Sequence, residues 1–266
     1  MTATTYFVVP AELPLRNPSM VSLAALRARI IVCRLCPRLV RHREAAANNP
    51  PRRYQGQRYW ARPLPGFGDP EARLLIVGLA PAAHGGNRTG RMFTGDGSGQ
   101  WLAHALHEAG FASQPSSTHV GDGFGLTDAY ITAAVRCAPP GNKPTSREMA
   151  RCQPYLEAEL QLLPRVRVVV ALGRIAFEAF LRSREATGRP RLKPKPRFAH
   201  GAQAQLPEGV TLIASYHPSQ QNTFTRKLTR SMLRSVFQKA RRLLNARAGR
   251  KCRNLRRYTM LKYIEG

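Results

Sequence analysis

The segment with the most evident capacity for chemistry is a glycine-rich loop at residues 78–99, which directly follows the apolar run 74–79. Its glycines allow the backbone to approach a ligand closely. The polar and aromatic residues that could contact such a ligand are His84, Asn87, Arg88, Arg91, Phe93, Thr94 and Asp96. Loops at the carboxyl ends of parallel strands are where α/β proteins bind ligands. We therefore expect a ligand site here, and not a phosphate-binding loop, which would place a Lys before Ser or Thr at the helix start.

Several side chains of this loop have both a chemical and a structural interpretation. Phe93 could stack on a ring of the ligand or anchor the core. Asp96 could orient a water molecule, or it could only cap a helix that begins near Ser98. Arg88 and Arg91 could hold phosphates or pair with Asp96.

Two further polar loops follow other predicted strands. Asn142 lies in the proline-rich stretch 136–144, and its amide offers a donor and an acceptor side by side, which matches the edge of a nucleobase. His217 precedes Pro218 at the end of an apolar run, where it could donate to an oxyanion. The simpler alternatives are a turn asparagine and a structural histidine. The polar stretch 219–222 that follows His217 suits contact with a phosphate backbone.

Four cysteines form a candidate metal site. Cys33 and Cys36 make a Cys-x-x-Cys pair, and Cys137 and Cys152 follow about a hundred residues later. Four thiolates suit zinc or an iron–sulfur cluster. Fourteen residues separate the second pair, and a cluster several ångströms across is easier to reach from such spread positions. The alternative is four unrelated thiols.

The charge of the chain predicts a polyanionic partner. Lys and Arg number 42 against 15 Asp and Glu, which gives a net charge of +27. Such a field attracts DNA or RNA first, and an anionic membrane or an acidic protein second. Genome-wide enrichment in arginine is the alternative explanation.

The elements that must position these residues alternate between strands and helices, which favours a parallel sheet flanked by helices. Strands are predicted at 73–79, 130–135, 166–172 and 210–215. Helices are predicted at 98–109, 145–162, 174–181 and 225–246, and Thr145 and Glu148 would form a capping box.

The domain organisation is predicted to be simple. We expect an irregular segment at 1–19, a single domain at 20–246 with an exposed basic insertion at about 183–207, and a basic tail at 247–266. No apolar run approaches the roughly 20 residues of a membrane span, and the N-terminus lacks the features of a signal peptide. These observations predict a cytoplasmic protein.

Taken together, the motifs resemble those of the uracil-DNA glycosylase superfamily, and most of all its iron–sulfur type 5 (UDGb) family. The matching stretches are GLAPAAHG at 78–85, NRTGRMFTGD at 87–96, RCAPPGNKP at 136–144 and HPS at 217–219. The resemblance implies a three-layer α/β/α fold around a four-stranded parallel sheet. It also implies a structural 4Fe–4S cluster on the four cysteines.

The resemblance implies removal of uracil from double-stranded DNA by hydrolysis of the N-glycosidic bond, leaving an abasic site. Other deaminated bases, such as hypoxanthine and xanthine, are expected substrates too, and a monomer is expected. Most of the superfamily carries Asp, Asn or Glu in the first motif, whereas this chain has Leu79, Ala80 and Ala82 there. That departure fits type 5 and argues against type 4, which would have Glu at position 79.

The hypothesis for the mechanism assigns a role to each motif. The target nucleotide flips out of the duplex, Phe93 stacks on its base, and Asn142 binds the base edge. His217 stabilises the departing base, and Asp96 positions water, with His84 as the alternative. Backbone groups of Gly78, Leu79 and Ala80 add contacts to the base. The expected DNA contacts are Arg88, Arg91, Lys143, Ser219, Gln220, Gln221 and Asn222.

Two rival hypotheses remain from the sequence. One is a non-catalytic nucleic-acid-binding protein with a structural metal or cluster site. The other is a relative that traps DNA covalently, for which a basic, histidine-bearing insertion after the first motif would be expected. The first motif instead continues unbroken into Phe93 and Asp96.

Overall fold

The computed structural model describes residues 22–261, with side chains described for residues 22–246. The predicted irregular segment 1–19 lies outside the described residues. The strands are β1 (Phe67–Gly68), β2 (Leu74–Gly78), β3 (Ala129–Ala133), β4 (Val168–Leu172), β5 (Gln203–Gln205) and β6 (Thr211–Ser215). The α-helices are α1 (Leu23–Ile31), α2 (Pro37–Asn48), α3 (Gly86–Thr89), α4 (Gly97–Glu108), α5 (Ser146–Leu162), α6 (Arg174–Ala186), α7 (Gln220–Phe224) and α8 (Arg230–Leu261).

The sheet has the order β1-β3-β2-β4-β6-β5. Its four central strands, β3, β2, β4 and β6, are parallel, as predicted. The expected strand number needs correction, because β1 and β5 add short antiparallel edges to β3 and β6. The chain passes from β2 to β3 on one side and then to β4 on the other. This reversal beside β2 creates the kind of crevice in which α/β folds bind ligands.

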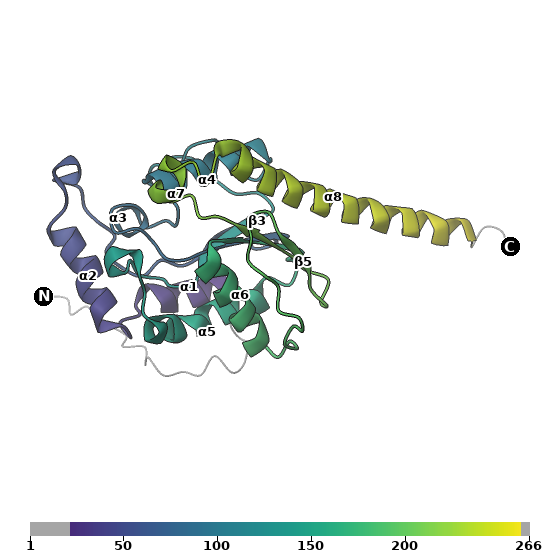
Figure 1. The fold of residues 1–266 in the computed structure, drawn as a ribbon, viewed down its shortest axis with the longest axis horizontal. Helices are drawn as coiled ribbons and strands as arrows, with labels where there is room; N and C mark the ends of the chain where they lie inside the picture. The colour runs from purple at the N-terminus through teal and green to yellow at the C-terminus, as the bar shows by residue number, and fades with distance from the viewer. Residues whose placement is uncertain (1–21, 262–266) are drawn as a thin grey trace, which may run out of the picture.

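Helices cover both faces of the sheet, which confirms the predicted three-layer α/β/α fold (Figure 1). Leu74 and Ile76 of β2 belong to the core under α4 and α8. Leu75 and Val77, which alternate with them, belong to the core under α5 and α6. Every residue of the four central strands is buried, as expected for strands covered on both sides. The sheet is therefore a rigid platform with one functional edge, at the carboxyl ends of its parallel strands.

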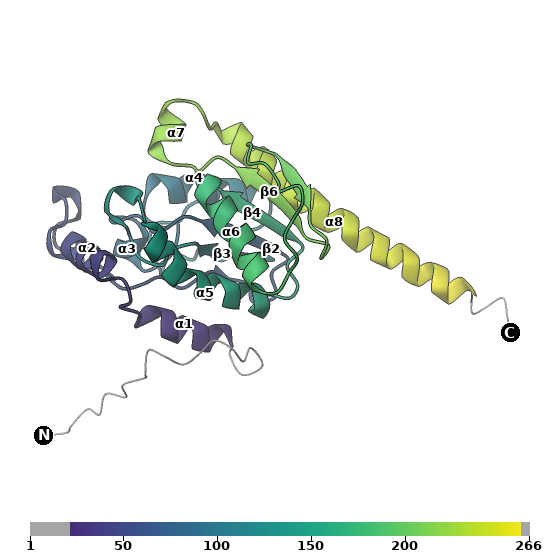
Figure 2. The same ribbon diagram turned by 60° about the horizontal axis from the view of Figure 1, so that its bottom comes forward.

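The helix predictions are confirmed in part. Thr145 caps α5, and its side chain and that of Glu148 form the predicted capping box. The helix predicted at 225–246 is confirmed as α8, although α8 begins later than predicted, at Arg230. The short helix α7 precedes it, with Arg226 between the two at φ +57°. The helical backbone of α8 continues through most of the predicted basic tail to Leu261 and extends away from the body (Figures 1 and 2).

The predicted exposed insertion at 183–207 needs correction at both ends. Ser183 and Arg184 belong to α6 and are buried, and Arg184 forms a two-pronged ion pair with Glu208 at 2.7 and 2.8 Å. At the other end, β5 pairs with β6. None of the helices in the described part of the chain has the length and apolar character that a membrane span requires.

Candidate active site

In the loop that follows β2, the ring of Phe93 packs back against Gly78 at the end of the strand. A Cβ atom placed on Gly78 would lie 2.8 Å from Cε2 of Phe93, so only glycine leaves room for this ring at the end of β2. Phe93 itself has φ +51°, a conformation that is uncommon for a bulky residue. The surrounding structure therefore holds Phe93 in a strained conformation, a feature that clusters at functional sites.

Phe93 lies beside His217, which follows β6, a strand that β4 separates from β2 in the sheet. Their ring centroids are 5.9 Å apart, with 35° between the ring planes. Gly173, at the end of β4, also lies against His217, and a Cβ atom there would be 3.5 Å from the histidine Cβ. The ends of β2, β4 and β6 thus bring together two residues that are more than a hundred positions apart in sequence.

His217 is electrically neutral at physiological pH. Burial lowers the pKa of its imidazole to about 4. The side-chain amide of Asn222 donates to the backbone carbonyl of His217 at 2.8 Å, which holds the backbone that carries the ring. A neutral imidazole carries one N–H group and can therefore donate a hydrogen bond to a neighbouring oxygen.

Asp96 caps α4, which confirms the capping alternative. Its Oδ1 accepts from the Gly99 N–H at 2.8 Å. The other oxygen, Oδ2, packs against Gly85, where any side chain would collide with it. Burial raises the pKa of the Asp96 carboxyl, although hydrogen bonds from backbone amides at the helix start oppose the shift. The role of Asp96 in positioning water remains a prediction.

His84 lies in a separate aromatic group. Its Nδ1 is 3.0 Å from the hydroxyl of Tyr59, and its ring stacks with that of Tyr54 at 6.2 Å. Burial lowers the pKa of the imidazole, and the neighbouring guanidinium groups of Arg53 and Arg88 lower it further.

The two arginines of the loop stabilise the loop itself. Arg91 is buried, and its Nη2 donates to both carboxylate oxygens of Asp122, at 2.7 and 2.9 Å. The predicted DNA contact of Arg91 is therefore wrong, because its donors are directed into the protein. Arg88 donates to the carbonyls of His84 and Gly95, each at 2.8 Å.

Asn142 and Lys143 lie in an exposed turn beyond β3. Asn142 adopts φ +57°, a left-handed conformation that asparagine tolerates better than most residues. Leu79 and Gly78 anchor the same chain segment, because their carbonyls accept from Val135 and Ala134 at 2.9 and 3.0 Å. These bonds hold the start of the loop that carries Asn142 at the carboxyl edge of the sheet.

The segment after His217 presents side chains to solvent. Ser219 caps α7 through a bond from the Asn222 N–H at 3.4 Å, while Gln220 and Gln221 are exposed. Phe224, at the end of α7, is 79% exposed, an unusual state for a phenylalanine. Sequence reasoning did not single out Phe224, which lies just before the helix predicted at 225–246.

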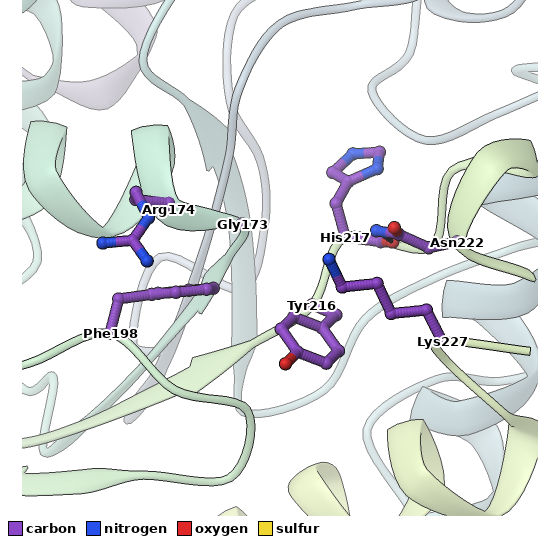
Figure 3. Close-up of a pocket in the computed structure, with 7 residues that line it drawn as sticks. All are labelled: Gly173, Arg174, Phe198, Tyr216, His217, Asn222 and Lys227. Atoms are coloured by element: carbon purple, nitrogen blue, oxygen red, sulfur yellow. Dashed lines mark hydrogen bonds between the residues drawn. The ribbon is translucent and has the colours of Figure 1, made fainter.

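A pocket of about 310 Å³ lies beside His217. Its lining residues are Gly173, Arg174, Phe198, Tyr216, His217, Asn222 and Lys227. Arg174 and Phe198 face Tyr216 and Lys227 across it (Figure 3). The guanidinium of Arg174 lies 5.3 Å from the Phe198 ring centre, and Nζ of Lys227 lies 5.1 Å from that of Tyr216. Sequence reasoning missed both cations and the contribution of Phe198, which comes from the supposed insertion.

The four cysteines come from the connection between α1 and α2, from the segment after β3 and from α5. Cys36, Cys137 and Cys152 share one buried cluster. Cys33 lies beside it, because its thiol is hydrogen-bonded with the hydroxyl of Tyr155 and is close enough to Cys36 and Cys137 to interact with them electrostatically. Burial raises the pKa of Cys137 to about 11 and that of Cys152 to about 12. Within residues 22–246, no three His, Cys, Asp or Glu side chains lie close enough together for a single metal ion.

Buried hydrogen-bond donors surround these thiols. Arg43 Nη1 donates to Sγ of Cys137 at 3.0 Å, while its Nε has no partner among the described residues. Arg136 likewise has two buried nitrogens without a partner there, and its backbone N–H donates to Cys152. Four spread thiols with spare donors fit a group larger than one ion that carries its own acceptors, as an iron–sulfur cluster does.

Comparison with known proteins gives a consistent result. A family model for the uracil DNA glycosylase superfamily matches residues 65–241. The type-5 uracil-DNA glycosylase of Thermus thermophilus is 56% identical over 214 residues, which cover 80% of this chain and 94% of the relative. The protein of the same name from Mycobacterium tuberculosis is 52% identical, with 84% and 82% covered. That from Pyrobaculum aerophilum is 46% identical, with 80% and 89% covered.

Proposed function

The chain belongs to the uracil-DNA glycosylase superfamily, and we propose that it is a type-5 enzyme that removes uracil from DNA by hydrolysing the N-glycosidic bond. The observation that carries the proposal is the meeting of Phe93 and His217 at the carboxyl edge of the sheet, with ring centroids 5.9 Å apart. An aromatic face for the base and a neutral N–H donor for its oxygen are what base excision requires.

Binding of the flipped base is assigned to Phe93 and Asn142. Phe93 stacks on the ring of the base, and the exposed amide of Asn142 reaches its edge. Backbone groups of residues 78–80 complete the wall, where Gly78 leaves room for Phe93. A pocket with few polar side chains accepts uracil and also hypoxanthine or xanthine, because little in it rejects a larger ring.

Departure of the base is assisted by His217. As the glycosidic bond breaks, negative charge develops on the uracil oxygens. The His217 N–H donates to that charge without first having to lose a proton, because its pKa of about 4 keeps the ring neutral. A preorganised donor of this kind stabilises the transition state more than the ground state.

The water that attacks the sugar is assigned to Asp96. Its carboxyl has a raised pKa, which brings it closer to the range in which a general base works at neutral pH. Oδ1 accepts the capping bond from Gly99. His84 is the alternative, since its lowered pKa keeps it unprotonated and able to accept a proton.

The DNA is held mainly by the segment after β6 and by the cationic pocket. Arg174 and Lys227 supply charge for a phosphate beside the flipped nucleotide, and Gln220, Gln221 and Lys143 lie exposed along the same edge. Extruding a base leaves a gap in the stack. Phe224, exposed at 79%, is the apolar side chain placed to fill that gap.

The four cysteines are proposed to hold a 4Fe–4S cluster. Their thiols, with the spare donors of Arg43 and Arg136, fit such a group. When bound, the cluster supplies a crosslink between α1–α2, the end of β3 and α5. Its ligands must be thiolates. Burial raises the pKa values of Cys137 and Cys152, and the positive charge of bound iron would favour their deprotonation.

The proposal is tested by incubating excess protein with a duplex that contains one uracil, followed by hot alkali. We expect strand cleavage at the uracil position, because alkali breaks abasic sites. If the strand stays intact, the remaining hypothesis is a non-catalytic DNA-binding protein. An alkali-stable protein–DNA product would indicate covalent trapping.

The assignment of Asn142 is tested with a panel of bases. In Asn142→Ala, we expect the ratio of the uracil and hypoxanthine excision rates to change by about tenfold. This is the effect of losing one hydrogen bond between neutral groups, about 1.4 kcal/mol. Lys143→Ala, next to it, is the matched control and should leave the ratio unchanged. An unaltered ratio in Asn142→Ala would remove that residue from base recognition.

A further inference from the structure

Arg43 is a buried arginine that pairs with sulfur. It lies on α2, its side chain is only 2% exposed, and no carboxylate within residues 22–246 forms an ion pair with it. Its Nη1 donates to Sγ of Cys137 at 3.0 Å and lies 3.4 Å from the carbonyl of Cys33. Burying a guanidinium without a carboxylate is costly, so this arrangement requires electron-rich partners in the cysteine site.

The backbone of the same residue holds the loop that follows β2. The carbonyl of Arg43 accepts from Nδ2 of Asn87 at 3.1 Å, and Asn87 is fully buried. Asn87 also fixes the loop through its own backbone, which bonds to Ala82 and Ala61 at 3.1 Å each. Arg43 therefore contacts the cysteine site through its side chain and the loop through its main chain.

The two segments proposed to form the base pocket, the loop 84–96 and the segment 137–142, each include a residue that Arg43 contacts. Asn87 lies between Gly85, which packs on the carboxylate of Asp96, and Arg88, which bonds to Gly95. Cys137 lies five residues before Asn142 in sequence. A shift of Arg43 would change the distance between the Asp96 side of the pocket and the Asn142 side.

We propose that Arg43 is a positioning residue that joins the cysteine site to the loop 84–96 and so fixes the geometry of the base pocket. The inference rests on the proposed function only for the meaning of that pocket. A hydrogen bond and a positive charge directed at a ligating sulfur also stabilise the reduced form of an iron–sulfur cluster. Arg43 thus belongs to the cysteine site and to the pocket at once.

The first test compares Arg43→Gln with Arg41→Gln, an exposed arginine on the same helix. In the intact protein, Arg43→Gln should lower the reduction potential of the cluster. It should also make backbone amides of residues 84–91 exchange with solvent about tenfold faster, because the lost bond to Cys137 no longer holds the Arg43 carbonyl in place against Asn87. Arg41→Gln should change neither. Unchanged potential and unchanged exchange in Arg43→Gln would overturn the proposal. If Arg43→Gln does not fold, Arg43→Lys, which keeps the charge but has fewer donors, is measured by amide exchange alone: faster exchange in residues 84–91 supports the proposal, and unchanged exchange overturns it.

The second test removes the other half of the link. Asn87→Ala should leave the visible spectrum and potential of the cluster as in the unaltered protein, yet speed amide exchange in 84–91 and slow single-turnover excision. The Arg43→Gln and Asn87→Ala effects on exchange should be smaller together than their sum, because each breaks the same connection. Strict additivity would show that the residues act independently. Because exchange and potential need no DNA, these results stand even if the protein fails to excise uracil.

Discussion

The two loops that meet at the proposed pocket are built in opposite ways. In the loop after β2, Arg88, Arg91 and Asp96 direct their polar groups into the protein. In the segment after β6, Phe224 and Lys227 extend into solvent. Both loops are polar in sequence, so composition alone does not separate them. The difference supports the proposal that the loop after β2, with His217, acts on the base, while the segment 219–227 holds the DNA.

Asp96→Asn gives the largest expected effect on chemistry. The amide keeps an oxygen to cap α4, so stability should change little, but a general base is lost. We expect single-turnover excision to slow about 100-fold or more, with DNA affinity retained.

The pH profile sharpens this prediction for Asp96. A base works when deprotonated, so the excision rate should fall as pH drops through the raised pKa of Asp96, and Asp96→Asn should abolish that fall. If Asp96→Asn weakened DNA binding as much as it slowed excision, the residue would be structural only, and the same measurements on His84→Gln would then be decisive.

His217→Ala should have the next largest effect. Loss of one preorganised donor costs about 100-fold in rate. Since the ring stays neutral down to pH about 4, the contribution of His217 should be constant from pH 6 to 9. Single-turnover rates of the variant and the unaltered enzyme over that range provide the measurement. A ratio that varies with pH would mean that the histidine changes its protonation state during the reaction.

Arg91→Met tests the structural half of the comparison. It leaves Asp122 buried without its partner, which should cost about 3 to 5 kcal/mol of the free energy of unfolding, measured by urea denaturation. Arg88→Met is the matched control, and its loss should be smaller because its partners are carbonyls near the surface.

The dependence of stability on pH also tests the ion pair between Arg91 and Asp122. Burial opposes ionisation of Asp122, but hydrogen bonds from Arg91 and backbone amides outweigh it and lower the pKa of that carboxyl. A lowered pKa contributes stability above the unfolded value of about 3.9, and this stability is lost as pH falls below it. The free energy of unfolding should therefore fall less steeply with decreasing pH in Arg91→Met than in the unaltered protein. An equal pH dependence in both proteins would show that the pair does not set it.

Lys227→Ala should have the smallest effect, confined to binding. Removing one phosphate contact should reduce the dependence of log affinity on log salt by about one unit. The rate at saturating enzyme should be unchanged. Lys195→Ala, another exposed lysine outside the pocket lining, is the control. An unchanged salt dependence would remove the cationic pocket from DNA binding.

Much of the fold was predictable because its signals are local. The four central strands are short apolar runs buried on both faces, and the capping box of α5 needs only four neighbouring residues. The edge strands could not be predicted, since β1 has two residues and β5 is a polar segment that only its pairing with β6 makes a strand. The break between α7 and α8 depends on the conformation of Arg226, which no pattern marks.

The site was predictable where residues act through their own chemistry and not where they act through distant partners. Phe93 and His217 were singled out from their motifs, and the structure brings their rings together. The burial of Arg91 was missed because Asp122 lies 31 residues away. The pocket cations Arg174 and Lys227 were missed because they come from two separate elements that only the fold brings together.

The central proposal is that the loop after β2, together with His217, acts on the glycosidic bond, while the segment 219–227 holds DNA. It is tested most directly by single-turnover excision of uracil from a duplex over a range of enzyme concentrations, for the unaltered protein, Asp96→Asn and Lys227→Ala. The account predicts that Asp96→Asn lowers the plateau rate at an unchanged midpoint, and that Lys227→Ala shifts the midpoint at an unchanged plateau. No alkali-labile product from the unaltered protein, or the same pattern of change in both variants, would contradict it.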